Sequence, residues 1–316
     1  MKFLVTALHQ DWRRLRTLDA VPAEAGSGHR GVVALVDWDT KAILAQASYD
    51  SPSGAYLDEN ELWLCSCAGH HIRVFDNHLQ FVRLHIHRLF NDLHTVTPGA
   101  RGVLVTASGT DAILEVTSDQ GIGWTWLATQ HGYDRLLSGG IRRVAAHKDW
   151  SQFAVGTMEE TTHINSAAVF DDRTVLATLF AQGELIKIDR LTGRADVMLR
   201  GLDRPHRIQR IRGSGSGWTV CDSATSRVIL LDESLNIVRE IYGGFNWVQD
   251  AVALNGIMFV LDANNCRIVE YDLARNRCTA EFLYPEKWKG FGLLPVPTQW
   301  EEPLLAINEW GETYVG

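Results

Sequence analysis

Three histidines occupy similar places in the sequence, each near the start of a short, mostly apolar segment. They are His94 in DLHTV, His163 in THINS and His206 in PHRIQ. Three imidazole ligands that leave one coordination position open are typical of catalytic zinc sites, and imidazole also binds iron. If the three side chains converge, the sequence predicts a divalent transition metal, Zn or Fe, that activates a water molecule or a small organic substrate.

Residues close to these histidines supply further candidate groups. Asp250, in the segment QDAVA, is the predicted base or the group that orients a metal ligand, and His206 is predicted to act in catalysis as well as in metal binding. Arg207 is a candidate for holding a substrate carboxylate, and Trp247 for walling an apolar pocket. The reactions that fit such a site are hydrolysis, elimination and oxygenation.

An internal repeat predicts the fold that brings these residues together. Each copy has thirteen residues and consists of an apolar strand, a small or polar turn and an alternating strand that mostly ends in Asp. The copies begin at residues 64, 105, 177, 220 and 260, so three of the four spacings lie between 40 and 43 residues. Four short antiparallel strands repeated at roughly this interval are typical of a β-propeller blade.

The two ends of the chain predict how the ring closes. Segments 3–9, 32–37 and 42–48 resemble the second, third and fourth strands of a blade, and segment 290–297 resembles a first strand. Segment 304–310 also resembles a second strand, which leaves the register of closure open. We predict an all-β, six-bladed β-propeller, a single domain over all 316 residues that is closed by both termini so that sheet edges are hidden.

Two long insertions interrupt the repeat, at residues 9–29 and 129–161. Both are expected on the face that carries the loops between second and third strands. Loops of this length are usually functional or disordered, so the pair suggests a lid or a partner surface. His131 and Arg135, in the segment HGYDR of the second insertion, are predicted to contact a substrate at the mouth of the channel.

The first strands of a propeller line its central channel, and side chains alternate along each strand. His163 and His206 both stand 14 residues before the aligned second strand, so we predict that they are equivalent in neighbouring blades, whereas His94 stands 11 residues before it. Three consecutive blades would then bring three imidazoles to one end of the channel. Asp92 and Glu160 are close enough in sequence to orient them.

Parts of the sequence resemble known families. Residues 204–243 resemble an NHL-type blade, and the architecture is similar to that of six-bladed enzymes such as gluconolactonase, strictosidine synthase and the peptidyl-hydroxyglycine amidating lyase. The motif order D-x-H, T-H-x-N, P-H and Q-D-A-V over roughly residues 90–265 also resembles an uncharacterised bacterial propeller family.

These resemblances differ in the site that they imply. The amidating lyase holds zinc through three channel histidines, which implies that role for His94, His163 and His206. The calcium hydrolases of the same group use Glu, Asn and Asp, and the matching positions of this chain are mostly His. The resemblance therefore implies a fold and a channel site, but not calcium and not a particular reaction.

Two other hypotheses remain open from the residues alone. A non-catalytic propeller would bind a protein or a small ligand through the face with the insertions, and its histidines would only fill the channel. A metal-free, lyase-like enzyme would use one histidine as a base.

Composition limits the class of protein. The net charge is −8 and Lys and Arg are scattered, so the sequence shows no nucleic-acid footprint. No apolar run approaches the roughly 18 residues of a membrane span, and the start lacks the apolar core of a secretion signal. The five cysteines, an odd and low number, argue against a disulfide scaffold. We therefore expect a cytoplasmic protein that binds a small molecule, with a protein partner as a further option.

Overall fold

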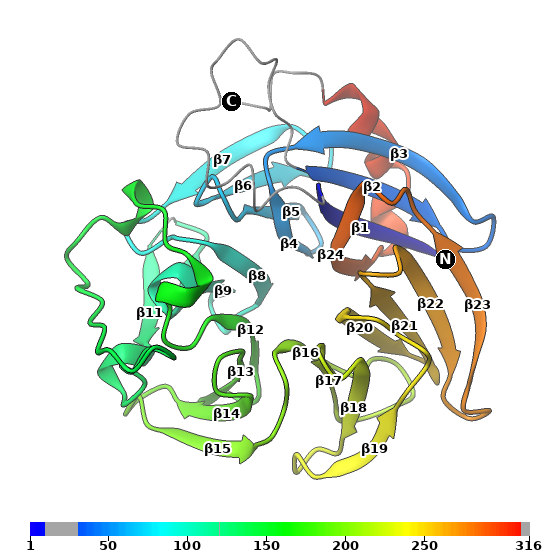
Figure 1. Cartoon of the computed structure of the whole chain (residues 1–316). Coiled ribbons are helices and arrows are strands. Elements are labelled where there is room, and N and C mark those ends of the chain that lie inside the picture. Colours follow the sequence, from blue (N-terminus) through cyan, green and yellow to red (C-terminus); the bar gives the residue numbers. More distant parts are fainter. Residues whose placement is uncertain (10–30, 120, 311–316) are drawn as a thin grey trace.

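The computed structural model describes residues 1–9, 31–119 and 121–310. Within these ranges the chain forms six four-stranded antiparallel sheets, arranged as blades around a central channel (Figure 1). This confirms the all-β, six-bladed propeller predicted from the repeat. None of the described helices is both long enough and apolar enough to span a bilayer.

Each blade runs from an inner strand beside the channel to an outer strand at the rim. Blade 1 consists of β24 (Trp288–Pro295), β1 (Lys2–His9), β2 (Gly31–Asp37) and β3 (Ala42–Tyr49). Blade 2 consists of β4 (Pro52–Leu57), β5 (Glu61–Ser66), β6 (His71–Asp76) and β7 (Phe81–Ile86). Blade 3 consists of β8 (Leu93–Pro98), β9 (Gly102–Ala107), β10 (Ala112–Thr117) and β11 (Ile122–Leu127).

The other three blades follow in chain order. Blade 4 consists of β12 (Ile164–Val169), β13 (Thr174–Leu179), β14 (Glu184–Asp189) and β15 (Ala195–Leu199). Blade 5 consists of β16 (Pro205–Arg210), β17 (Trp218–Asp222), β18 (Arg227–Leu231) and β19 (Ile237–Ile241). Blade 6 consists of β20 (Val248–Leu254), β21 (Ile257–Asp262), β22 (Arg267–Asp272) and β23 (Arg277–Leu283).

Both ends of the chain build blade 1. Strand β24 pairs with β1, with Phe3 opposite Pro295, so segment 290–297 supplies the inner strand as predicted. Segment 304–310 is not a second strand, because β1 is already paired on both sides, with β24 and with β2. It forms the short helix η6 (Pro303–Glu309) instead, preceded by η5 (Thr298–Trp300).

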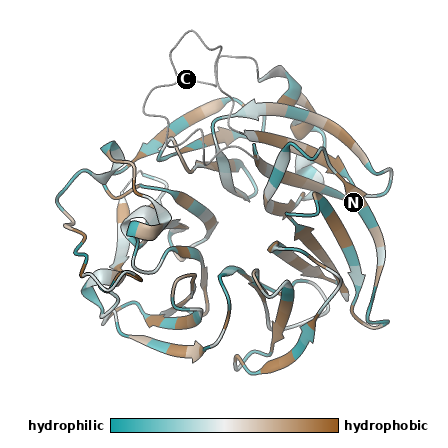
Figure 2. Ribbon diagram, viewed as in Figure 1, coloured by the Kyte–Doolittle hydropathy of each residue, from teal (hydrophilic) through white to brown (hydrophobic). Residues whose placement is uncertain are grey.

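The core lies between neighbouring blades. Leu104 and Ile113 of blade 3 pack in one buried cluster with Val175 and Ile186 of blade 4. Second strands such as β13 are buried on both faces and mostly apolar, whereas the outer strand β3 has a solvent face and alternates between exposed and buried residues (Figure 2). Inter-blade packing of this kind holds the inner strands, and with them the channel side chains, in fixed positions.

One buried carboxylate ties the second insertion to the ring. Asp111 follows the short helix η1 (Ser108–Thr110) and accepts hydrogen bonds from the backbone N–H groups of Thr161, Thr162 and His163, at 2.9, 2.8 and 3.0 Å. It also pairs with Arg142 of the insertion, at 2.6 Å. The insertion is therefore fastened over the face that carries the loops between second and third strands, as predicted.

The second insertion contains only short helical turns, namely η2 (Ala128–Gln130), η3 (Trp150–Gln152) and η4 (Thr157–Glu159). The first insertion leaves the ring at the end of β1, and from residue 10 onward it lies outside the described residues.

Candidate functional site

A small cavity, called the upper chamber here, lies at the end of the channel where the inner strands begin. Its volume is about 50 Å³, and all three predicted histidines line it. Lys289 brings a positive charge to the same cavity and lies 5.2 Å from the ring centre of Trp247. The apolar part of the lining is formed by Leu8, Phe180, Trp247 and Phe291, and other polar residues are Asp92, Thr157 and Gln249.

The three histidines do not occupy the equivalent positions that their spacing suggested. In blades 2 to 6 the inner strand follows one residue in a left-handed conformation, and in blades 3, 4 and 5 these turn residues are Asp92 (φ 50°), His163 (φ 48°) and Arg204 (φ 55°). His94 and His206 lie two residues after their turn residue, whereas His163 is itself the turn residue. The predicted equivalence of His163 and His206 is therefore wrong. Counting back from the second strand fails because the turn between first and second strands differs in length among the blades.

His206 is held as a neutral imidazole. Its Nδ1 lies 3.0 Å from the carbonyl oxygen of Arg204 and 2.8 Å from Oγ of Ser223. Since the Ser223 hydroxyl donates to the carbonyl of Val248, Nδ1 carries the imidazole proton and Nε2 carries the lone pair. Burial, followed by the nearby His94, lowers the pKa of His206 well below its usual value. His206 is thus a base that stays unprotonated at neutral pH.

His94 repeats this arrangement in blade 3. Its Nδ1 lies 3.2 Å from the carbonyl oxygen of Asp92 and 3.1 Å from Oγ of Ser108, whose hydroxyl donates to the carbonyl of Ile164. The ring meets that of His163 edge-on, with 4.6 Å between the ring centres. The same tautomer follows, with the proton on Nδ1.

The pKa of His163 is displaced in the opposite direction. Its Nδ1 contacts Oε2 of Glu160, and both side chains are buried. Burial alone lowers the pKa of His163, but the Glu160 carboxylate and its hydrogen bond outweigh burial, so the pKa is raised. The protonated form of His163, which would carry a proton on Nε2 as well, is therefore favoured more than in an ordinary histidine. Glu160 was expected to orient a histidine, and the structure shows it in that position.

The three histidines do not form one metal-binding group. In the described part of the chain, the group of potential ligands that brings three ligand atoms within 4.8 Å of one another is Asp92, Glu160 and His163. Ligands of one zinc ion lie about 2 Å from it, so nitrogens that share an ion must lie closer together than this limit. His94 and His206 do not join the group, and the residues present do not fit a three-histidine zinc or iron site.

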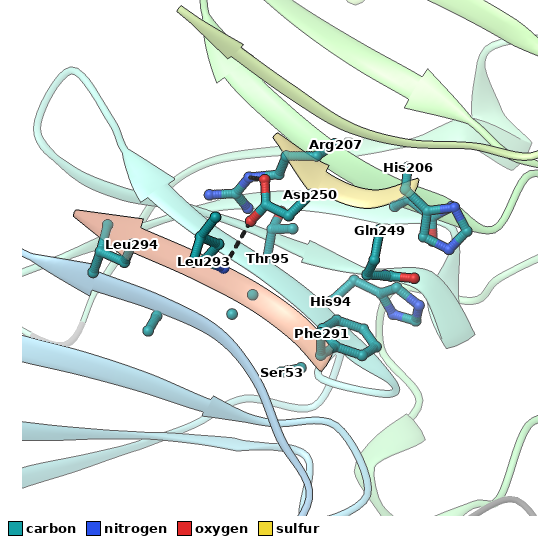
Figure 3. A pocket seen from close by; sticks show the side chains of 14 residues that line it. Ser53, His94, Thr95, His206, Arg207, Gln249, Asp250, Phe291, Leu293 and Leu294 are labelled. Carbon is teal, nitrogen blue, oxygen red and sulfur yellow. Dashed lines mark hydrogen bonds and ion pairs between the residues drawn. The ribbon is translucent and has the colours of Figure 1, made fainter. Parts of the chain in front are cut away.

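Below the upper chamber the channel narrows to a cavity of about 20 Å³, called the neck here. Asp250 and Arg207 lie together in it, with 3.7 Å between Oδ1 and Nε (Figure 3). Figure 3 shows this pair apart from His206, His94 and Phe291, which gather at the other end.

Asp250 lines the neck together with His94 and His206, but its hydrogen bonds go to other groups. Its oxygens accept hydrogen bonds from Gln209 Nε2 at 2.5 Å and from the backbone N–H groups of Ala251 and Leu293 at 2.8 and 3.0 Å. Burial raises the pKa of its carboxyl group. A register shift in β20 between Val248 and Asp250 re-aims the side chains, and the upper chamber is lined by Gln249 instead. The predicted role of Asp250 as a base therefore stays a prediction, and none of these hydrogen bonds joins it to a histidine.

Of the remaining predicted substrate contacts, one lines the upper chamber and two lie outside both cavities. Trp247 lines the upper chamber as expected, packs edge-on against His206 at 5.3 Å and donates to Gln249 Oε1 at 2.9 Å. His131 is exposed and stacks on Trp126 at 5.5 Å, and Arg135 is exposed in a bridge with Ile141. His131 and Arg135 line neither the upper chamber nor the neck, because the insertion fastens to the ring through Asp111 and its first part stays over the rim of blade 3.

Three site residues were not singled out from the sequence. Ser108 and Ser223 fix the tautomers of His94 and His206, and Phe180 packs between His163 and His206. All three stand at the same place in the repeat, directly after the second strand. An alignment of the repeats by this position would have found them.

No family model matches the chain, and no curated protein matches it. Similar solved structures exist. One is a protein of unknown function from Bacteroides caccae, with 13% identity and a TM-score of 0.62, covering 93% of this chain and 98% of that one. Another belongs to a nidogen/laminin complex, with 10% identity, a TM-score of 0.64, and coverage of 93% and 97%.

A third similar structure is virginiamycin B lyase from Staphylococcus aureus, with 12% identity, a TM-score of 0.52, and coverage of 75% of this chain and 71% of that one. At such low identity these likenesses establish the propeller fold and no more.

Proposed function

We propose that this chain is a lyase-type enzyme in which two histidines of the upper chamber act as base and acid on a small organic substrate. The observation that carries the proposal is that His206 and His163 line one cavity and have pKa values displaced in opposite directions. Paired titratable groups whose environments push their pKa values apart are the pattern of acid–base catalysis.

The geometry suits an elimination. His206 Nε2 would remove a proton from a carbon next to a carbonyl group, and Lys289 would stabilise the negative charge that develops there. The C–O bond one carbon away would break as a C=C bond forms, and His163 would donate its Nε2 proton to the leaving oxygen. One proton thus moves to His206 and one leaves His163, so the pair must exchange protons with water before the next turnover.

The size of the chamber limits what enters it. About 50 Å³ accommodates only the reacting end of a substrate, so the remainder must lie outside, toward the second insertion, whose Thr157 reaches the lining. Lyases among the structural neighbours support this class of reaction, and a catalytically inactive histidine-to-alanine variant of virginiamycin B lyase has been solved with quinupristin.

A substrate screen tests the proposal. The full chain would be incubated with esters and lactones that carry an acidic C–H next to the carbon bearing the oxygen leaving group, and conjugated C=C products would be followed by absorbance and mass. We expect turnover by the wild type and by the surface control His78→Gln, and its loss in His206→Gln.

Heavy-oxygen water separates the possible results. Elimination leaves the products unlabelled, whereas incorporation of solvent oxygen would show hydrolysis and overturn the proposed reaction. Folded protein that turns over no member of the panel, yet retains a ligand through the insertion face, would favour the non-catalytic binding propeller.

A further inference from the structure

The other end of the channel contains a larger cavity, called the lower chamber here. Its volume is about 400 Å³, within the range of roughly 300–1,000 Å³ that is typical of small-molecule sites. The inner strands of several blades wall it, and no histidine is among its lining residues. The neck adjoins it, because Arg207 lines both cavities, and His94 and His206 line the neck as well as the upper chamber. Its apolar walls include Tyr56, Val96, Ala168, Ile208 and Leu294.

Three arginines stand among these apolar walls, and their charges are balanced unequally. Arg210 pairs with Glu233 at 2.9 Å and stacks over Trp218. Arg207 is paired less closely, with Asp250. Its Nε is buried without a hydrogen bond among the described residues, and its 3.7 Å contact with Asp250 is longer than a hydrogen bond.

The single Asp250 carboxylate, whose oxygens also accept hydrogen bonds from Gln209, Ala251 and Leu293, is the one negative charge beside Arg207 among the ion pairs of the described residues. Arg212 adds a second cation to the lining. Burial, followed by the positive charge of Arg207, lowers the pKa of Arg212, which shows that the two guanidinium groups repel each other. The lower chamber thus combines apolar walls with an excess of positive charge.

We infer that the lower chamber binds a carboxylate with an apolar chain, such as a medium-chain fatty acid. The carboxylate would accept hydrogen bonds from Arg207 and neutralise the repulsion with Arg212, because the planar guanidinium fork matches a carboxylate. The apolar chain would lie along Val96, Ala168 and Leu294. This site is separate from the upper chamber and does not rest on the proposed lyase activity.

Calorimetry with octanoate on the full chain tests this site. We expect saturable binding of one octanoate per chain, and binding of octanol at least 10-fold weaker because octanol lacks the charge. Arg207→Met should weaken octanoate binding at least 10-fold, whereas the surface control Arg194→Met, which removes an exposed cation paired with Asp196, should change it less than twofold.

Two further variants keep the test decisive. Arg207→Met alone leaves the buried Asp250 without its cation, so the double variant Arg207→Met/Asp250→Asn removes both charges and should fold but not bind octanoate. Ala168→Trp should block the chamber sterically, and His163→Ala, at the opposite end, should leave octanoate affinity unchanged. The inference is overturned if folded wild type gives no binding heat, if octanol binds as well, or if affinity survives in the double variant or in Ala168→Trp.

Discussion

The upper and lower chambers share the same inner strands and yet hold opposite chemistry. In the upper chamber, each histidine has its Nδ1 occupied by a named partner, so that the protonation state of each ring is set by its surroundings. In the lower chamber, Arg207 lies 3.7 Å from Asp250, its Nε makes no hydrogen bond among the described residues, and the walls are mostly apolar. The first arrangement suits proton transfer by fixed groups, and the second suits capture of a charge from outside.

The difference follows from where each chamber lies along the strands. The upper chamber lies at the strand starts, beside the loops between second and third strands and beside an insertion, so polar partners such as Ser223 and Glu160 are within reach. The lower chamber lies beyond the bulges of the inner strands, where the neighbours are mostly strand residues. The arrangement of side chains in the upper chamber therefore depends on loops, and the arrangement in the lower chamber depends on the ring.

The largest expected effect tests the proton transfer proposed for the upper chamber. His206→Ala should reduce turnover of an eliminated substrate by about 10²–10⁴-fold, the range that a positioned general base contributes. The rate is measured on the best substrate of the screen, with His78→Ala, an exposed histidine, as the matched control. Equal rates in His206→Ala and wild type would remove His206 from the mechanism.

A second change tests whether only the upper chamber depends on the insertion. Asp111→Asn keeps a residue type that tolerates φ 49°, but it removes the charge that holds Arg142 and three N–H groups. We expect the free energy of unfolding to fall by about 2–4 kcal/mol and protease cleavage within residues 129–161 to become faster.

The folded fraction of the Asp111→Asn variant should bind octanoate with unchanged affinity, because the insertion does not line the lower chamber. Asp119→Asn, at an exposed turn, is the control for the charge change and should alter neither stability nor cleavage. If the insertion resists the protease as well in Asp111→Asn as in the wild type, Asp111 is not its anchor.

A third change concerns the charge state of His163. Glu160→Gln removes the carboxylate that raises the pKa of His163, so this pKa should fall by about 1 unit or more, equivalent to 1.4 kcal/mol per unit. In the wild type, the raised pKa stabilises the fold fully below the unfolded value near 6.5, and this contribution is lost as pH rises through the folded pKa.

NMR titration of the histidine rings measures the effect of Glu160→Gln directly. The contribution of His163 to stability should lose its pH dependence in this range, and the alkaline limb of the activity profile should move to lower pH. The lowered pKa of His206 should stay below its usual value. An unchanged titration of His163 would show that Glu160 does not set its charge.

The smallest expected effect comes from removing metal. Because the three histidines do not form one ligand group, dialysis of the protein against a chelator should leave activity unchanged, as measured with elemental analysis in parallel. Stoichiometric metal that is lost in His94→Gln and His206→Gln would restore the three-histidine hypothesis. Metal lost only in Glu160→Gln would point to Asp92, Glu160 and His163 instead. Either result would contradict metal-free acid–base chemistry.

The fold was predictable because the same pattern of strands and turns recurs several times in the sequence. The recurring strand–turn–strand segment gave the blade, and the incomplete strand sets at both ends, such as segments 3–9 and 290–297, gave closure through β1 and β24. The helix η6 was mistaken for a strand because its apolar residues fit either element, and only the occupied edges of β1 exclude a strand there.

The sequence by itself determined the ring, and it determined that three histidines and Trp247 reach one end of the channel. The tertiary structure decided how deep in the channel each side chain lies. Turn lengths and bulges differ among the blades, and a shift of one residue turns the side chains of a strand to its other face. It therefore made His94, not His163, the counterpart of His206, and it placed Asp250 with Arg207. It also decided the charge of each imidazole, since partners such as Ser223 and Glu160 come from other strands and loops.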